Sequence, residues 1–137
     1  MNILVPIDGS DTSKKALNNA INIAKEKDAK IYLLSVVEKQ GLTLPSVVDY
    51  QEKKAELSKI LKEQKSRIES LNLKCESILK TDREPNRAII KDSERYNIDL
   101  IVIGRRGLNK INRIMVGTTS FYVIANAKMD VLVISED

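Results

Sequence analysis

Short apolar runs rich in β-branched residues alternate with segments of helical periodicity along this chain, and no other feature limits its fold as strongly. Such runs are typical of strands buried on both faces of a parallel sheet. Regular alternation of strand and helix is typical of a doubly wound sheet. The sequence predicts an α/β fold with five parallel strands, at Ile3–Ile7, Lys30–Val37, Leu73–Leu79, Asp99–Ile103 and Val131–Ile134.

Four helices are predicted between these strands, on both faces of a Rossmann-like sheet. Ser10 or Asp11 can cap the first helix, whose apolar residues recur at helical spacing through Ala24. Pro85 suits the first position of the third helix, and the fourth is expected at Thr118–Ala127. A chain of 137 residues has the length of one domain, so residues 1–137 are predicted to form a single domain.

The segment Glu38–Tyr50 contains Gly41 and Pro45 and is predicted to be irregular. A loop of this length in a compact domain is usually functional or mobile, which makes it a candidate flap over a binding site. The segment that follows, Gln51–Leu71, has the pattern of an amphipathic helix. Its predicted buried stripe consists of Ala55, Leu57, Ile60, Leu61, Ile68 and Leu71.

The stretch Ile101–Ser120 carries the strongest functional signal. Gly104 and Gly107 follow a predicted strand, can adopt positive φ, and let an anion approach the backbone N–H groups. Gly117 precedes a predicted helix start, where unpaired N–H groups and the helix dipole favour phosphate. Each glycine alone could simply shape a turn. The hydroxyl side chains that would assist are Thr118, Thr119 and Ser120.

In the order strand, Gly-x2-Gly, nine residues, Gly-Thr and helix, this stretch resembles the nucleotide-binding pattern of the universal stress protein family, in its ATP-binding subgroup. The similarity extends over essentially the whole chain and includes Val5–Ser10, Leu34–Val37 and Val131–Ile134. It implies an ATP-binding homodimer that acts as a nucleotide-dependent stress or regulatory module, read by an unknown protein partner. Mg²⁺ could accompany the phosphates.

The resemblance also implies roles for individual residues. Adenine is expected near the backbone of Val36, and ribose near Asp8, with Pro6 and Ile7 beside it. Asp8 follows the first strand and so is expected where the strand order reverses, although it could merely start a turn. The phosphates are assigned to Gly104, Arg105, Gly107, Leu108, Asn109, Lys110, Gly117, Thr118, Thr119 and Ser120, and the dimer contact to Val131, Leu132, Val133 and Ile134.

Two positions depart from the family pattern. Arg83 stands where many relatives have the glycine of a Gly-x-Pro turn, and Asp130 stands where a proline commonly precedes the last strand. Neither position belongs to the phosphate pattern. Arg83 is expected to affect the rim near the third strand, and Asp130 the geometry of the dimer edge.

Rapid catalysis is not expected. The chain has neither a Gly-x4-Gly-Lys-Ser/Thr loop nor a Gly-x-Gly-x-x-Gly after its first strand, and its 137 residues include no histidine to act as a general base. Three alternatives remain open beside ATP binding. They are a slow Mg²⁺-dependent ATPase, a binder of AMP or a cyclic nucleotide, and a nucleotide-free dimeric interaction protein.

Composition argues against several other classes. With no histidine and one cysteine, neither a zinc site nor an internal disulfide is expected. The net charge of +4 is spread along the chain apart from a cluster within the glycine stretch, and aromatic residues make up only 4%, so nucleic-acid binding is not expected. No apolar run reaches the length of a membrane span, and no signal peptide is recognisable. We therefore expect a cytoplasmic protein without membrane contact.

Overall fold

Five parallel strands form a single sheet in the order β3-β2-β1-β4-β5, which confirms the predicted fold class. The computed structural model describes residues 1–39, 41, 43–105 and 118–135. The strand order reverses at β1, which pairs with β2 on one side and β4 on the other. The strands are β1 (Asn2–Pro6), β2 (Lys30–Glu38), β3 (Cys75–Asp82), β4 (Leu100–Arg105) and β5 (Asp130–Ser135).

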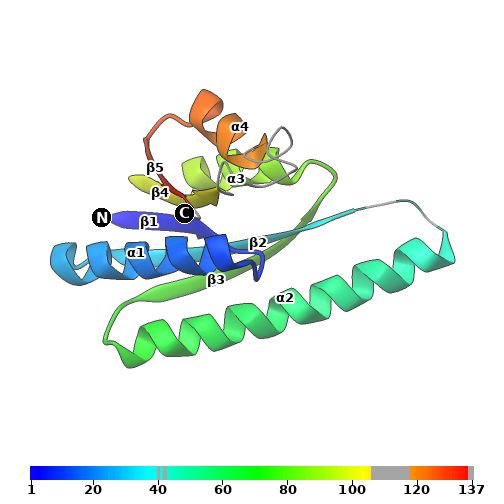
Figure 1. Ribbon diagram of the computed structural model, residues 1–137, viewed down its shortest axis with the longest axis horizontal. Coiled ribbons are helices and arrows are strands. Elements are labelled where there is room, and N and C mark those ends of the chain that lie inside the picture. Colours follow the sequence, from blue (N-terminus) through cyan, green and yellow to red (C-terminus); the bar gives the residue numbers. More distant parts are fainter. Residues whose placement is uncertain (40, 42, 106–117, 136–137) are drawn as a thin grey trace.

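Within the described part of the chain, two helices cover each face of the sheet (Figure 1). Because successive side chains of a strand point to opposite faces, β1 contributes side chains to the hydrophobic core on each face of the sheet. Ile3 and Val5 pack on one face, and Leu4 packs on the other. The first face is covered by α1 (Asp11–Lys27) and α2 (Leu44–Ser70), the second by α3 (Pro85–Arg95) and α4 (Thr118–Asn126).

The prediction of an irregular segment up to Tyr50 was wrong in its second part, because α2 already begins at Leu44. Thr43 is the N-cap residue, and Pro45 lies in the first turn, where its missing N–H leaves no helical hydrogen bond unmade. The first turns of α2 extend past the sheet (Figure 1). Ala55 is accordingly exposed, contrary to the predicted stripe.

The remainder of α2 packs as an amphipathic helix. Leu61 and Ile68 are buried, and Leu57 and Ile60 are half-buried. Leu71 follows the helix as its C-cap and is 38% exposed, so it does not belong to the buried stripe. Strand β3 runs three residues past the predicted Leu79, because it stays in register with β2 as far as the pair Glu38 and Asp82.

Candidate functional site

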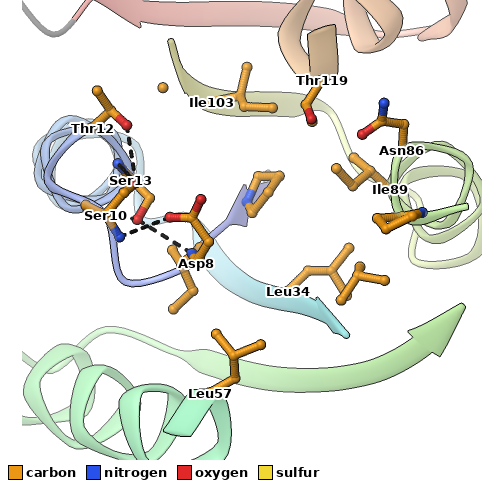
Figure 2. A pocket seen from close by; sticks show the side chains of 15 residues that line it. Asp8, Ser10, Thr12, Ser13, Leu34, Leu57, Asn86, Ile89, Ile103 and Thr119 are labelled. Carbon is orange, nitrogen blue, oxygen red and sulfur yellow. Dashed lines mark hydrogen bonds between the residues drawn. The ribbon is translucent and has the colours of Figure 1, made fainter. Parts of the chain in front are cut away.

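A cavity of about 260 Å³ opens at the carboxyl ends of β1, β2 and β4, where the strand order reverses (Figure 2). Ligands of open parallel sheets bind at this position. The cavity combines apolar walls with a few polar groups, as small-molecule sites do. Its lining residues are Pro6, Ile7, Asp8, Ser10, Thr12, Ser13, Leu34, Val36, Leu57, Pro85, Asn86, Ile89, Ile103, Gly104 and Thr119.

The turn between β1 and α1 holds Asp8 at the cavity. Asp8 Oδ1 accepts a hydrogen bond from Ser10 N at 2.9 Å, and Gly9 supplies the positive φ of 85° that the turn needs. Ser10 Oγ accepts from Ser13 N at 3.2 Å, so Ser10, rather than Asp11, caps α1. The Asp8 side chain is exposed to the cavity, and Ser10 occupies only one of its oxygens.

Gly104 is the one glycine of the predicted motif among the described residues, and it does not have the positive φ that was expected. Among the described glycines only Gly9 has a positive φ. A Cβ on Gly104 would lie 2.5 Å from the carbonyl oxygen of Thr12 and 2.8 Å from its carbonyl carbon. The absence of a side chain therefore lets the end of β4 approach the first turn of α1, which narrows the cavity between them.

The backbone of Val36 also faces the cavity. Ile7 N donates to Leu34 O at 2.8 Å, which is the last backbone–backbone hydrogen bond between the β1 segment and β2 along this edge of the described chain. Backbone groups alternate direction along a strand, so the N–H and C=O of Val36, two residues later, point to the same side, past the end of β1. Ser35 Oγ donates to Ile7 O at 2.7 Å and fixes the chain there.

Helix α3 forms the opposite wall and is anchored by an ion pair whose carboxylate is buried. Lys80 Nζ on β3 lies 2.5 Å from Asp92 Oδ1 on α3. The Asp92 side chain is 1% exposed, and its second oxygen, Oδ2, has no hydrogen-bond partner within the described part of the chain. The pair joins β3 to the helix that presents Pro85, Asn86 and Ile89 to the cavity.

Six of the predicted nucleotide-binding residues come together in this cavity: Pro6, Ile7, Asp8, Val36, Gly104 and Thr119. Arg105 ends β4 and Ser120 is buried within α4, and neither is among the lining residues. Thr118 is the first residue of α4. The remaining predicted residues lie outside the described part of the chain: Gly107, Leu108, Asn109, Lys110 and Gly117.

The sequence analysis missed lining residues that come from helices. Thr12 and Ser13 lie in the first turn of α1, Leu57 in α2, and Asn86 in the first turn of α3. A signal for three of these positions, Thr12, Ser13 and Asn86, was present, because helix starts that follow parallel strands lie at the carboxyl edge of the sheet. Leu57 gave no such signal, since its place depends on how α2 packs.

The predicted dimer segment forms an edge strand. Val131, Val133 and Ile134 are half-buried, and Leu132 is 37% exposed. On the neighbouring α4, Phe121 is 76% exposed. Asp130 stands in place of the proline that is common in the family, and it begins β5 in register with Leu100, so the strand forms without that proline. Arg83 is exposed just before α3.

Other reactive groups in the described residues lie away from the cavity. Cys75 is buried in the core, and burial raises the pKa of its thiol to about 12, which keeps it protonated and unreactive at neutral pH. Residues 1–39, 41, 43–105 and 118–135 contain no group of three His, Cys, Asp or Glu side chains arranged for a metal ion. They also contain no helix long and apolar enough to cross a membrane. The cytoplasmic location stays a prediction.

Comparisons with known proteins agree on one family. A model of the universal stress protein family matches residues 1–135. A universal stress protein of Methanocaldococcus jannaschii is 34% identical, covering 98% of this chain and 81% of the relative, and one of Bacillus subtilis is 31% identical, covering 96% and 97%.

Solved structures give the same result. The universal stress protein UspA from Lactobacillus plantarum is 28% identical and has a TM-score of 0.84, with 98% of this chain and 97% of that chain covered. A universal stress protein in complex with cAMP is 26% identical and has a TM-score of 0.76, with 98% and 96% covered. The similarity thus spans sequence and fold over nearly the whole chain.

Proposed function

The chain belongs to the universal stress protein family, and from this premise we propose that it binds an adenine nucleotide, with ATP as the leading candidate, in the cavity at the strand ends. The observation that carries the proposal is that Asp8, Val36 and Gly104 line one cavity at the position where the strand order reverses. These groups come from three different strand ends, and each suits a different part of a nucleotide.

The ligand is proposed to lie across the carboxyl edge of the sheet. The base lies against the apolar wall, where Val36 N–H and C=O can bond its edge, and a hydroxyl pair of the ribose bonds the Asp8 carboxylate. The phosphates extend toward Gly104 and the amino end of α4, where the positive end of the helix dipole favours an anion. The segment 106–117 connects those two elements and carries the other predicted phosphate residues.

A second candidate ligand is a nucleoside monophosphate, including the cyclic form. The similar structure in complex with cAMP supports it, because that protein shares the fold over nearly the whole chain. Val36 would bond the base in the same way for either ligand. Asp8 would bond the hydroxyl pair of the ribose in ATP or AMP but only the 2′-hydroxyl of cAMP, whose 3′-oxygen is esterified. The candidates differ also in how many phosphate groups must be held beyond Gly104.

The direct test is to identify what the protein carries and then what it prefers. Freshly purified protein is denatured, and any released adenine nucleotide is identified by chromatography. Stripped protein is then titrated calorimetrically with ATP, ADP, AMP and cAMP, with and without Mg²⁺. We expect ATP to bind most tightly. Tighter binding of AMP or cAMP would favour the second candidate, and the absence of binding by all four would refute a nucleotide site.

Asp8→Asn is expected to weaken ATP binding about tenfold, because a hydrogen bond to a charged group contributes about 1.5–3 kcal/mol and the amide retains only part of it. Asparagine keeps an oxygen that can accept from Ser10 N, so the turn should persist. The matched control is Asp11→Asn, which removes an exposed carboxylate from the same helix start but outside the cavity. Equal affinities of the two variants would contradict a ribose contact at Asp8.

We also propose that the protein is a homodimer joined along the outer edge of β5. Among the described strands β5 has a neighbour, β4, on one side only, and an uncovered edge strand is a ready site for pairing with another chain. Exposed apolar side chains lie beside this edge, at Leu132 on β5 and at Phe121 and Ile124 on α4. A partner protein that reads the nucleotide state completes the proposed regulatory role.

The double variant Phe121→Glu/Ile124→Glu is expected to raise the dimer dissociation constant at least about tenfold, because buried aromatic and aliphatic anchors dominate interface energies. Sedimentation velocity over a concentration series measures it. The control is Val47→Glu/Val48→Glu, which places the same charges on the other exposed apolar helix face, in α2. Dissociation by the α2 variant and not by the α4 variant would move the interface to α2.

A further inference from the structure

Asn86 adds a polar side chain to the cavity beside the groups proposed to bind the ribose and the phosphates. It lies on α3, across the cavity from Asp8, as Figure 2 shows. We infer that Asn86 selects the base, by pairing its side-chain amide with the 6-amino group and N7 of adenine. This inference rests on the proposed nucleotide site and names the group that makes the site specific for adenine.

The start of α3 fixes where Asn86 lies. The helix begins at Pro85, whose ring sets φ near the helical value, and Asn86 is its second residue. The ion pair between Lys80 and Asp92 anchors the helix to β3 two turns further on. Asn86 is half-buried in the cavity wall, and the helix that carries it is anchored. A side chain held on a rigid element can discriminate between ligands.

The hydrogen-bonding capacity of Asn86 is unused. On the α1 side of the cavity, Asp8, Ser10, Thr12 and Ser13 are bonded to one another. The Asn86 amide has no hydrogen-bond partner among the residues that the structure describes, although it offers two donors and an acceptor. Since Asn86 is half-buried and lines the cavity, this amide is available to a ligand.

The surroundings of Asn86 suit a flat heterocycle. Its neighbours on the wall, Pro85 and Ile89, are apolar, and Val36 and Leu34 face them from β2. Apolar groups above and below a ring, with one amide at its edge, form the arrangement that binds a nucleobase and reads its edge.

The chemistry of the amide matches adenine. An asparagine can accept a hydrogen bond from the 6-amino group of adenine while it donates one to N7. Guanine presents acceptors at both positions, O6 and N7, so the amide carbonyl would face an acceptor and one bond would be lost. The backbone of Val36 approaches the base from β2, leaving the N7 edge to Asn86.

The test compares ATP with 7-deaza-ATP, in which a C–H replaces N7 and nothing else changes. In wild-type protein we expect ATP to bind about fivefold more tightly, as one neutral hydrogen bond predicts. In Asn86→Leu, which keeps the approximate shape of the side chain without its amide, the two ligands should bind equally. Asn86→Asp, which keeps an acceptor for the 6-amino group but has no donor for N7, should also lose the preference.

Thermal unfolding of each variant, measured without ligand, shows whether α3 still folds. A preference for ATP over 7-deaza-ATP that survives in a folded Asn86→Leu protein would overturn the role of Asn86, as would equal binding in the wild type. Either result leaves the nucleotide site itself intact, because ATP still binds. If the wild type binds neither ligand, the proposed function fails and the base-selecting role fails with it.

Discussion

Lys80→Met is expected to lower the free energy of unfolding by about 3 kcal/mol, the lower end of the range for a buried ion pair that loses one partner. Methionine fills much of the space of the lysine stem but leaves the Asp92 carboxylate, which is 1% exposed, without its counter-charge. Asp92 Oδ2 already lacks a described partner, so Asp92 has little other compensation. Urea denaturation monitored by circular dichroism measures the change.

Two further variants separate charge burial from side-chain packing. Lys30→Met breaks the ion pair between Lys30 and Glu76, in which the lysine side chain is 33% exposed and the glutamate side chain 44% exposed. This variant is expected to lower the free energy of unfolding by at most about 1 kcal/mol. Adding Asp92→Asn to Lys80→Met removes the unpaired charge and should restore part of the loss. If Lys80→Met is as mild as Lys30→Met, the pair does not anchor α3.

Gly104→Ala is expected to destabilise the fold by about 2–3 kcal/mol and to weaken ATP binding more than tenfold. The new Cβ would lie 2.5 Å from the Thr12 carbonyl oxygen, a backbone atom that can yield only if α1 moves. Such a movement would shift Ser10, Thr12 and Ser13 away from the cavity. Denaturation and nucleotide titration of the same preparation measure the two effects.

Gly41→Ala is the matched control for Gly104→Ala. A Cβ at Gly41 meets no atom within 4 Å, and Gly41 does not have a positive φ. This variant should leave stability within about 0.5 kcal/mol and ATP affinity unchanged. A Gly104→Ala protein as stable as Gly41→Ala would show that β4 and α1 can separate without penalty.

The alternation of strands and helices was enough to predict the sheet, because a parallel strand buried on both faces leaves a strong apolar signal. The start of α2 was missed because Gly41 and Pro45 indicate a loop when they are considered as helix breakers. Pro45 instead lies in the first turn, where proline is favoured. The exposure of Ala55 could not be predicted, since it depends on how far the sheet extends beneath the helix.

For the site, the sequence indicated the groups that follow strands directly, such as Asp8 and Gly104, since the strand ends meet at one edge. The positive φ that the sequence suggested for Gly104 is not found in the structure. A close contact with Thr12 involves residues far apart in sequence, whereas backbone freedom is a local property. Asn86 was missed for a related reason, because its exposure to the cavity depends on how α3 is seated against the sheet.

The central strand of the sheet is also the first to be synthesised, and this order has a consequence for how the molecule assembles. Residues up to Asp82 supply β1, β2 and β3, so this half can pair its strands early. The other edge of β1 pairs with β4, for example Ile3 with Leu100. Pairing between residues so far apart in sequence is a slow step in folding. The cavity is bounded by both halves. We therefore expect the cavity to form last, so that a bound nucleotide would stabilise only the fully folded chain.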